Sequence, residues 1–184
     1  MLHVSRILEN AAEVTPDAIA ATLDDNALTF GDIERGGNRI AHAMLRSGIR
    51  RGDRVLWWGD TSLEAIGVFA AAAKVGAVFA PLNARSSLVE AMPVAEYARP
   101  SVVLGPTDHG GSVEQLARRL GVPFELKPAD EAFADERPNV ALDERDPHVI
   151  FFTSGSTGRP KGVVLSHRAN WLRTFVGATT SPGG

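Results

Sequence analysis

The sequence predicts an α/β fold in which a mainly parallel sheet lies between two layers of helices. From residue 54 to residue 126, short apolar runs typical of strands alternate with longer segments that carry helix start and stop signals. Strict alternation of this kind is typical of parallel strands joined by right-handed crossovers. The chain has 184 residues, 44% of them hydrophobic, which is enough to bury a substantial core.

The individual elements follow from apolar periodicity and from capping chemistry. Strands are expected at 18–23, 27–29, 54–58, 77–80, 101–104, 122–126, 149–152 and 163–165. Helices are expected at 4–14, after Thr29 as far as Ser47, from Thr61 to about Lys74, from Ser87, from Ser112 to Leu120, and from His167 to about Val176. Four of these starts have a hydroxyl residue followed three positions later by an acid or amide, the pattern of a capping box: Thr29 with Asp32, Thr61 with Glu64, Ser87 with Glu90, and Ser112 with Gln115.

Composition excludes several classes of function. The chain has no cysteine, which rules out disulfides, thiol catalysis and cysteine-ligated zinc. The formal net charge is -3, which argues against general nucleic-acid binding. Met1 to Asn10 lacks the apolar region of a signal peptide, and the longest apolar run, 65–73, is too short to cross a membrane. A cytoplasmic protein is therefore expected.

One loop carries the most specific chemistry. Between the apolar strands 149–152 and 163–165 lie glycines, four hydroxyl side chains and a lysine: Thr153, Ser154, Gly155, Ser156, Thr157, Gly158 and Lys161. Glycines let a backbone approach a ligand closely, hydroxyls donate to phosphate oxygens, and a lysine follows outer phosphates as a mobile charge. Pro160 before the lysine and the strands on both sides do not fit a Walker A loop. The pattern predicts a polyphosphate-binding loop, and a glycine-rich hairpin without a ligand is the alternative.

The residues from Thr153 to Val163 closely resemble the phosphate loop of the adenylate-forming enzymes, a superfamily that includes acyl-CoA synthetases, luciferases and the adenylation domains of peptide synthetases. Two upstream stretches strengthen the resemblance. Residues 28–55 are similar to the N-terminal segment of that family, and residues 69–83 are similar to its first core motif. Three matches in the correct order cover nearly the whole chain.

The resemblance implies the α/β fold of the N-terminal subdomain of such an enzyme, with contact between Lys161 and the β- and γ-phosphates of ATP. Complete members join a carboxylate to AMP with release of pyrophosphate, normally with Mg²⁺, and then transfer the acyl group to a thiol such as that of coenzyme A. Residues 159–167 and Pro81-Leu82-Asn83 look more like acyl-CoA synthetases than peptide-synthetase domains. The later family motifs, including the adenylation lysine, are absent, so no catalytic residue or metal ligand is assigned to this chain.

The chain therefore looks like the N-terminal portion of an acyl-CoA synthetase, inactive in isolation. The expected division is an α/β subdomain at 1–126, an exposed acidic and proline-containing connection at 127–147, and a strand, loop, strand and helix at 148–184. An apolar face is expected to bind the missing C-terminal part or a second copy of the chain. The alternatives are a non-catalytic interaction module, a peptide-synthetase adenylation domain, and a stand-alone nucleotide-binding or kinase-like domain, although no strand here ends in the acidic residue that this last class needs.

Other candidate residues have ordinary explanations. The adjacent residues Trp57 and Trp58 are expected to point to opposite faces of a buried strand and to pack there. Paired carboxylates at 130–131 and 135–136 are expected to be solvated. His167 is expected to be structural or solvent-facing more readily than functional, His42 to be partly exposed, and His3, His109 and His148 to lie in unrelated places. No two histidines have metal-ligand spacing.

Overall fold

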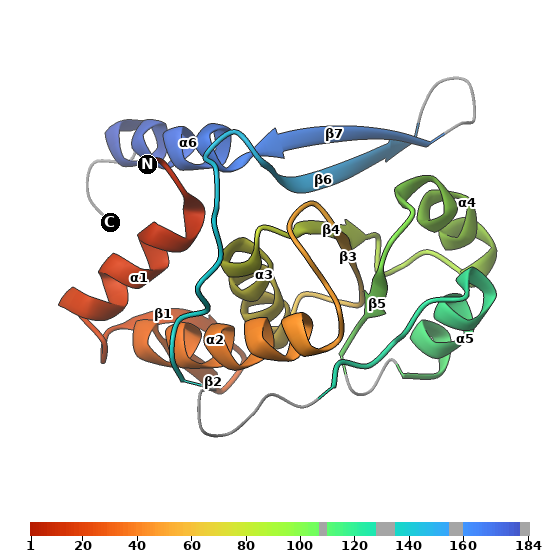
Figure 1. Ribbon diagram of the computed structural model, residues 1–184, viewed down its shortest axis with the longest axis horizontal. Helices are drawn as coiled ribbons and strands as arrows, with labels where there is room; N and C mark the ends of the chain where they lie inside the picture. The colour runs from red at the N-terminus through yellow and green to blue at the C-terminus, as the bar shows by residue number, and fades with distance from the viewer. Residues whose placement is uncertain (107–109, 128–134, 155–159, 181–184) are drawn as a thin grey trace.

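A computed structural model of the chain describes residues 1–106, 110–127, 135–154 and 160–180. Its helices are α1 (Val4–Val14), α2 (Phe30–Arg46), α3 (Leu63–Val75), α4 (Leu88–Ala98), α5 (Gly110–Leu120) and α6 (His167–Thr180). Its strands are β1 (Ile19–Leu23), β2 (Asn26–Thr29), β3 (Arg54–Trp58), β4 (Val78–Leu82), β5 (Val102–Leu104), β6 (Pro147–Ser154) and β7 (Pro160–Ser166). β1 and β2 form a small antiparallel sheet (Figure 1), and the other strands form one sheet in the order β5-β3-β4-β6-β7.

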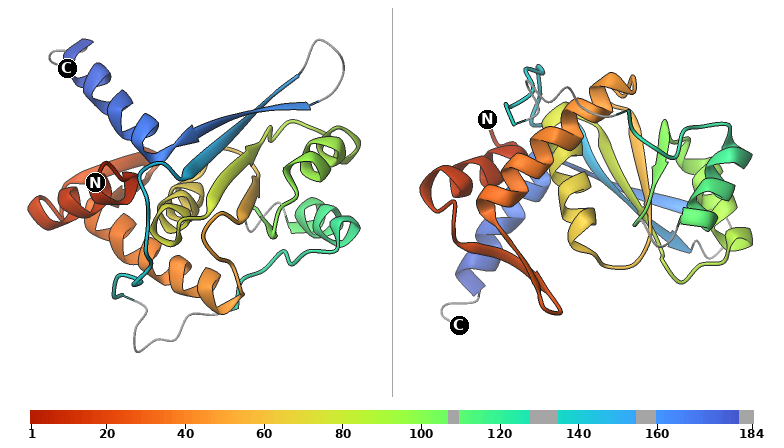
Figure 2. Two further views of the ribbon diagram at one scale, coloured as in Figure 1. Left: turned by 45° about the horizontal axis from the view of Figure 1, so that its top comes forward. Right: turned by 90° about the horizontal axis from the view of Figure 1, so that it is seen from below.

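The predicted three-layer architecture is confirmed. β5, β3, β4 and β6 are parallel, and β7 is antiparallel to β6. The pair α2 and α3 covers one face of the sheet, whereas α4 and α5 cover the other (Figure 2, right). Val55 and Trp57 of β3 enter the first core, while Leu56 and Trp58 enter the second. The prediction that the two tryptophans pack on opposite faces is therefore correct.

Helix starts agree with the predicted capping chemistry at two of four positions. Complete capping boxes, in which side chain and backbone bond reciprocally, occur at Thr29–Asp32 and Ser87–Glu90. α3 starts one residue later than predicted, because the hydroxyl of Ser62 rather than Thr61 accepts the N–H of Ala65 at 3.2 Å. The prediction for Ser112 is also wrong, since α5 already begins at Gly110.

The strand predicted at 122–126 is wrong. Within the described residues 110–127 this segment joins the sheet through one bond, from the Val103 N–H to the Pro123 carbonyl at 3.0 Å. Pro123 has no N–H to donate, so a regular strand pairing cannot continue through it.

In the described part of the connection before β6, charged contacts fix the chain to α2 and to the loop after α2. Arg39 pairs with Asp135 at 2.6 Å, and the Asn38 amide donates to the Asp135 carbonyl at 2.8 Å. The hydrogen bond from Arg39 lowers the pKa of the Asp135 carboxyl. Further along, Arg51 pairs with Asp146 at 2.6 Å, one residue before β6 begins. These contacts anchor the described part of the connection just before β6 (Figure 1).

A buried ion pair joins the first three helices. The Lys74 side chain on α3 is 1% exposed, with its Nζ 2.7 Å from Glu34 of α2 and 4.0 Å from Glu9 of α1. Burial lowers the pKa of Lys74, and the hydrogen bond to Glu34 opposes that change. Gly37 allows α2 to pack close to α3, because a Cβ at this position would lie 3.2 Å from both Ala70 Cβ and Lys74 Cε.

Gly37→Ala is expected to lower the free energy of unfolding by about 1–3 kcal/mol, because the added methyl group overpacks the contact between α2 and α3. Gly36→Ala is the matched control, since a Cβ at this neighbouring helical position would have no atom within 4 Å. It is expected to stabilise the protein by about 0.5–1 kcal/mol through helix propensity. Urea unfolding of both variants measures the difference, and similar stabilisation by both would contradict the close approach.

Candidate phosphate-binding site

The two ends of the predicted phosphate loop lie on neighbouring strands. The register of the β6–β7 hairpin places Thr153 directly opposite Lys161, and both residues are exposed. Opposite residues of an antiparallel pair point to the same face, so the hydroxyl and the ammonium group flank one surface. Ser154 is the last residue of β6. Four predicted site residues, Gly155, Ser156, Thr157 and Gly158, lie outside the described residues.

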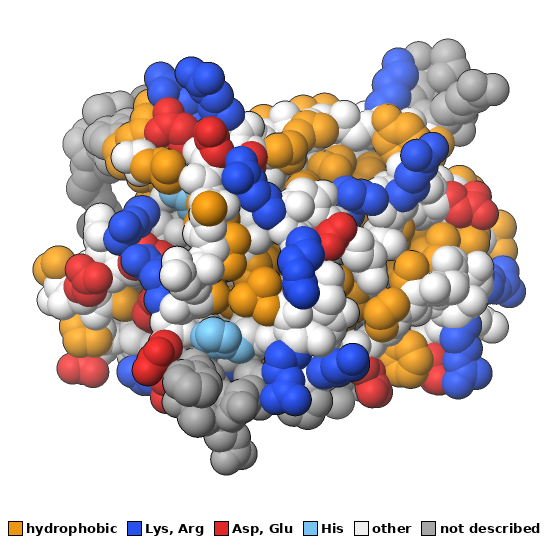
Figure 3. All heavy atoms as spheres, in the orientation of Figure 1, with side chains coloured by type: hydrophobic (Ala, Val, Ile, Leu, Met, Phe, Trp, Pro, Cys, Tyr) orange, Lys and Arg blue, Asp and Glu red, His pale blue; other side chains and the backbone are white. Residues whose placement is uncertain are grey.

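The two faces of the hairpin differ in what covers them. Ile150 and Phe152 pack against the second core, beside a hollow of about 420 Å³ that is also lined by Tyr97 of α4. On the opposite face, Phe151 and Val163 form a cross-strand pair and are 48% and 50% exposed. We call the surface formed by Phe151, Thr153, Lys161 and Val163 the outer face. Figure 3 shows hydrophobic side chains gathered over the hairpin.

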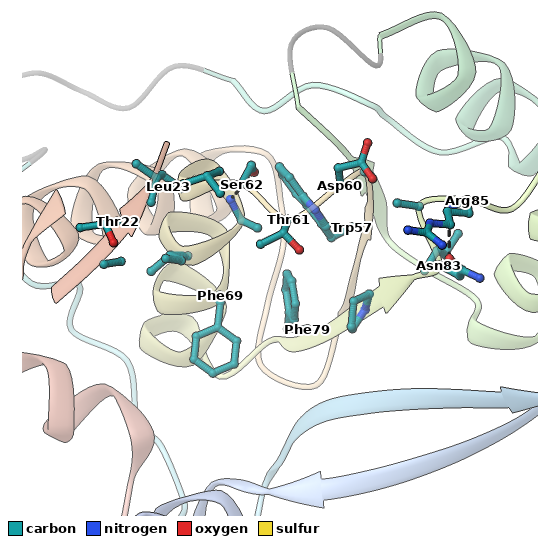
Figure 4. A pocket seen from close by; sticks show the side chains of 18 of the residues that line it. Thr22, Leu23, Trp57, Asp60, Thr61, Ser62, Phe69, Phe79, Asn83 and Arg85 are labelled. Atoms are coloured by element: carbon teal, nitrogen blue, oxygen red, sulfur yellow. Dashed lines mark hydrogen bonds between the residues drawn. The ribbon is translucent and has the colours of Figure 1, made fainter. Parts of the chain in front are cut away.

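A second cavity lies where the connections of β3 and β4 diverge. α3 follows β3 on one face of the sheet and α4 follows β4 on the other, which makes the carboxyl ends of these strands a topological switch point. Open α/β sheets bind ligands at such points. The structure has a cavity of about 780 Å³ there, with Trp57, Phe69 and Phe79 among its lining residues (Figure 4). We call it the switch-point crevice.

Polar groups surround one side of the switch-point crevice. Asp60 and Thr61 follow β3, whereas Asn83 and Arg85 follow β4. The Asn83 side chain accepts the backbone N–H of Arg85 at 3.1 Å, which shapes this loop. The sequence interpretation did not select these residues as site candidates, although polar residues directly after buried parallel strands are a recognisable signal.

The crevice and the hairpin belong to the same edge of the sheet. β4 and β6 are parallel neighbours, with Phe79 beside Val149, so their carboxyl ends point the same way. β4 ends before Asn83, and β6 ends at Ser154, within the predicted phosphate loop. An elongated substrate with a polyphosphate on one side and an organic group on the other fits this arrangement.

Two features are absent from the described part of the chain. No group of three or more histidine, aspartate or glutamate side chains there is placed to hold a metal ion. Among the same residues, no helix is both long and apolar enough to cross a membrane.

Comparison with known proteins identifies the family. The family model described as AMP-binding enzyme matches residues 8–182, and the chain belongs to this family. Feruloyl-CoA synthase from Amycolatopsis sp. is 36% identical over 159 residues, which are 85% of this chain and 32% of that protein. The fatty acid–[acyl-carrier-protein] ligase ScoC from Streptomyces coeruleorubidus is 30% identical over 165 residues, 86% of this chain and 32% of that protein.

A solved structure agrees with the family assignment. The inhibitor-bound N-terminal domain of FACL13 from Mycobacterium tuberculosis has a TM-score of 0.75 and 28% identity, and the match covers 91% of this chain and 45% of that one. The resemblance to adenylate-forming enzymes and their N-terminal fold is thereby confirmed. The chain spans about a third of the length of the two curated relatives.

Proposed function

We propose that this chain is the N-terminal, phosphate-binding portion of an ATP-dependent acyl-CoA synthetase. The complete enzyme would convert a carboxylate and ATP into an acyl-adenylate and pyrophosphate, and then form a thioester with coenzyme A. The observation that carries the proposal is the Thr153–Lys161 pair on the outer face, at the two ends of the family's phosphate loop. The relatives that act on feruloyl and fatty acyl groups support the ligase class.

In the proposed reaction, Lys161 stabilises negative charge on the outer phosphates as the α-phosphate is attacked and pyrophosphate leaves. Thr153 donates a hydrogen bond to a phosphate oxygen, and the loop residues Ser154 to Gly158 add hydroxyl and backbone donors. Mg²⁺ would neutralise the phosphates. Such an ion needs few protein ligands when phosphates and water complete its shell.

The switch-point crevice is proposed to receive part of an organic co-substrate. Its aromatic lining accepts an apolar group, while Arg85 offers a cation to an anionic one. The names of the two relatives indicate two candidate thiol acceptors, coenzyme A and an acyl-carrier protein. We favour coenzyme A because residues 159–167 resemble acyl-CoA synthetases. A peptide-synthetase adenylation domain is the runner-up.

The proposed division of labour follows the chain. Residues 1–126 form the supporting α/β subdomain, 127–147 connect it, and 148–184 carry the phosphate site. The ribose-binding and later lysine motifs of the family are missing from this sequence. We therefore propose that the chain alone does not form acyl-adenylates, and that its outer face binds the remainder of the enzyme.

Lys161→Ala in the complete enzyme is expected to lower carboxylate-dependent ATP–pyrophosphate exchange by about 10- to 1000-fold, because one charged contact to the phosphates is lost. Lys127→Ala is the matched control, since Lys127 is also exposed but lies in the connection. Unchanged exchange in Lys161→Ala would favour the non-catalytic interaction module. Robust exchange by the isolated chain would refute its proposed inactivity.

The isolated chain is expected to self-associate, or to bind the missing part when it is supplied, because an exposed apolar pair recruits a partner. Sedimentation velocity at increasing concentration should show association that is lost in a Phe151→Ser, Val163→Ser double variant. Val89→Ser is the matched control, as Val89 is 78% exposed on α4. A clean monomer at high concentration that also fails to bind the missing part would contradict this.

A further inference from the structure

Three histidines that are far apart in the sequence meet at the base of the β6–β7 hairpin. His3 precedes α1, His148 is the second residue of β6, and His167 begins α6 directly after β7. The three side chains are at most 1% exposed. The His167 ring lies in the middle, with centroids 3.5 Å from His3 and 4.4 Å from His148 and interplanar angles of 22° and 28°. The prediction that His3 and His148 lie in unrelated places was wrong, and His167 is buried. We call this group the histidine stack.

The surroundings of the histidine stack favour neutral rings. The Asn170 amide lies 3.0 Å from His148 Nδ1, where it donates, and Ser5 Oγ lies 3.0 Å from His3 Nδ1. Phe69 packs against His148 with a centroid distance of 4.6 Å. Among the described residues, His3 Nε2, His148 Nε2 and both nitrogens of His167 have no hydrogen-bond partner. A proton added to the stack would therefore create a buried cation without an acceptor.

Most charged groups near the histidine stack lower the pKa values of the histidines, as burial does. Burial lowers the pKa of His3 to about 4; Asp146 opposes this change, whereas Arg137 and Arg6 add to it. Burial lowers the pKa of His148 to about 3, with His3 acting in the same sense. The pKa of His167 falls to about 2 because of burial and then its two neighbouring imidazoles.

Other contacts show what the histidine stack joins. The Leu2 N–H donates to the Glu144 carboxylate at 2.7 Å, and Arg168 at the start of α6 pairs with the same carboxylate at 2.7 Å. The backbone of α6 is tied to the connection as well, through His167 N–H to the Asp146 carbonyl at 3.1 Å. The N-terminal residues, the start of β6 and the residues directly after β7 therefore meet at the buried histidine stack.

We propose that the histidine stack is an acid-sensitive latch that holds the N-terminal segment and α1 against the base of the β6–β7 hairpin. Protonation of any ring is disfavoured in the closed stack, so proton uptake accompanies its opening. The folded pKa values lie below the unfolded value of about 6.5, so the closed latch is fully stabilised above about pH 6.5. Its stability falls as the pH drops from there toward about 4, where His3 begins to protonate in the closed state. Hydrogen bonds from the Leu2 N–H and from Arg168 lower the pKa of the Glu144 carboxyl.

The latch is expected to affect nucleotide binding, because it determines how firmly the strands that carry Thr153 and Lys161 are held. This consequence depends on the proposed function: affinity for MgATP would decrease over the same pH range as the latch opens. The latch itself is independent of nucleotide chemistry, so it is tested without nucleotide.

The test is hydrogen–deuterium exchange of the chain between pH 7.5 and 4.5, corrected for intrinsic exchange. Protection in residues 2–12 and 144–150 is expected to decrease together below about pH 6.5, by about tenfold per pH unit for each proton taken up. β3 and α3 are expected to keep their protection at the same pH. His167→Phe and, separately, His3→Phe retain an aromatic ring but remove one proton site, so each is expected to make the decrease less steep by about tenfold per pH unit.

His42→Phe is the matched control, because His42 lies on α2 outside the histidine stack and contacts the Glu136 carbonyl. It should leave the pH dependence unchanged. If His167→Phe does not fold, the His3→Phe variant at the edge of the stack decides the question. Protection that does not depend on pH would overturn the latch. The latch would also be overturned if β3 and α3 lost protection at the same pH as residues 2–12. It would equally be overturned if protection in the His3→Phe and His167→Phe variants depended on pH as steeply as in the natural chain.

Discussion

The parallel pairing of β4 with β6 is the contact on which the candidate site depends most. It brings a strand from late in the chain beside one from its middle, with Val149 next to Phe79. Val149 is 2% exposed and belongs to the same core as Phe79, so burial of apolar surface fixes this register. Because β6 runs parallel to β4, this pairing also sets the direction of the hairpin that carries Thr153 and Lys161. Without it, the predicted phosphate loop and the switch-point crevice would not share an edge of the sheet.

The second constraint is that every strand in the middle of the sheet must be covered on both faces. Helices on alternate sides satisfy this, and the same alternation opens the crevice between the connections of β3 and β4. On the outer face of the hairpin, Phe151 and Val163 remain about half exposed. One architecture therefore explains a stable core, a ligand-sized cavity and an exposed apolar pair on the hairpin.

Local signals in the sequence were sufficient for most of the fold. The bounds of α1 and β3, the capping boxes of α2 and α4, and the opposite directions of Trp57 and Trp58 all follow from periodicity and side-chain chemistry. Local signals failed at Thr61 and Ser62, because two adjacent hydroxyl residues were both suited to cap α3. They also failed at Pro123, which interrupts a run of residues with the pattern of a strand. The histidine stack could not be predicted, since only the tertiary fold brings residues 3, 148 and 167 together. The sequence predicted Thr153 and Lys161 as phosphate-binding residues, but their cross-strand pairing could be seen only from the register of the hairpin.

The central claim is that the end of the β6–β7 hairpin binds the phosphates of ATP. An amide NMR titration of the ¹⁵N-labelled chain with MgATP tests it most directly, because it locates the ligand without requiring turnover. We expect the largest shifts at residues 153–161, smaller shifts around the switch-point crevice, and none in α5. An absence of shifts at millimolar MgATP, or shifts that leave 153–161 unchanged, would contradict the account.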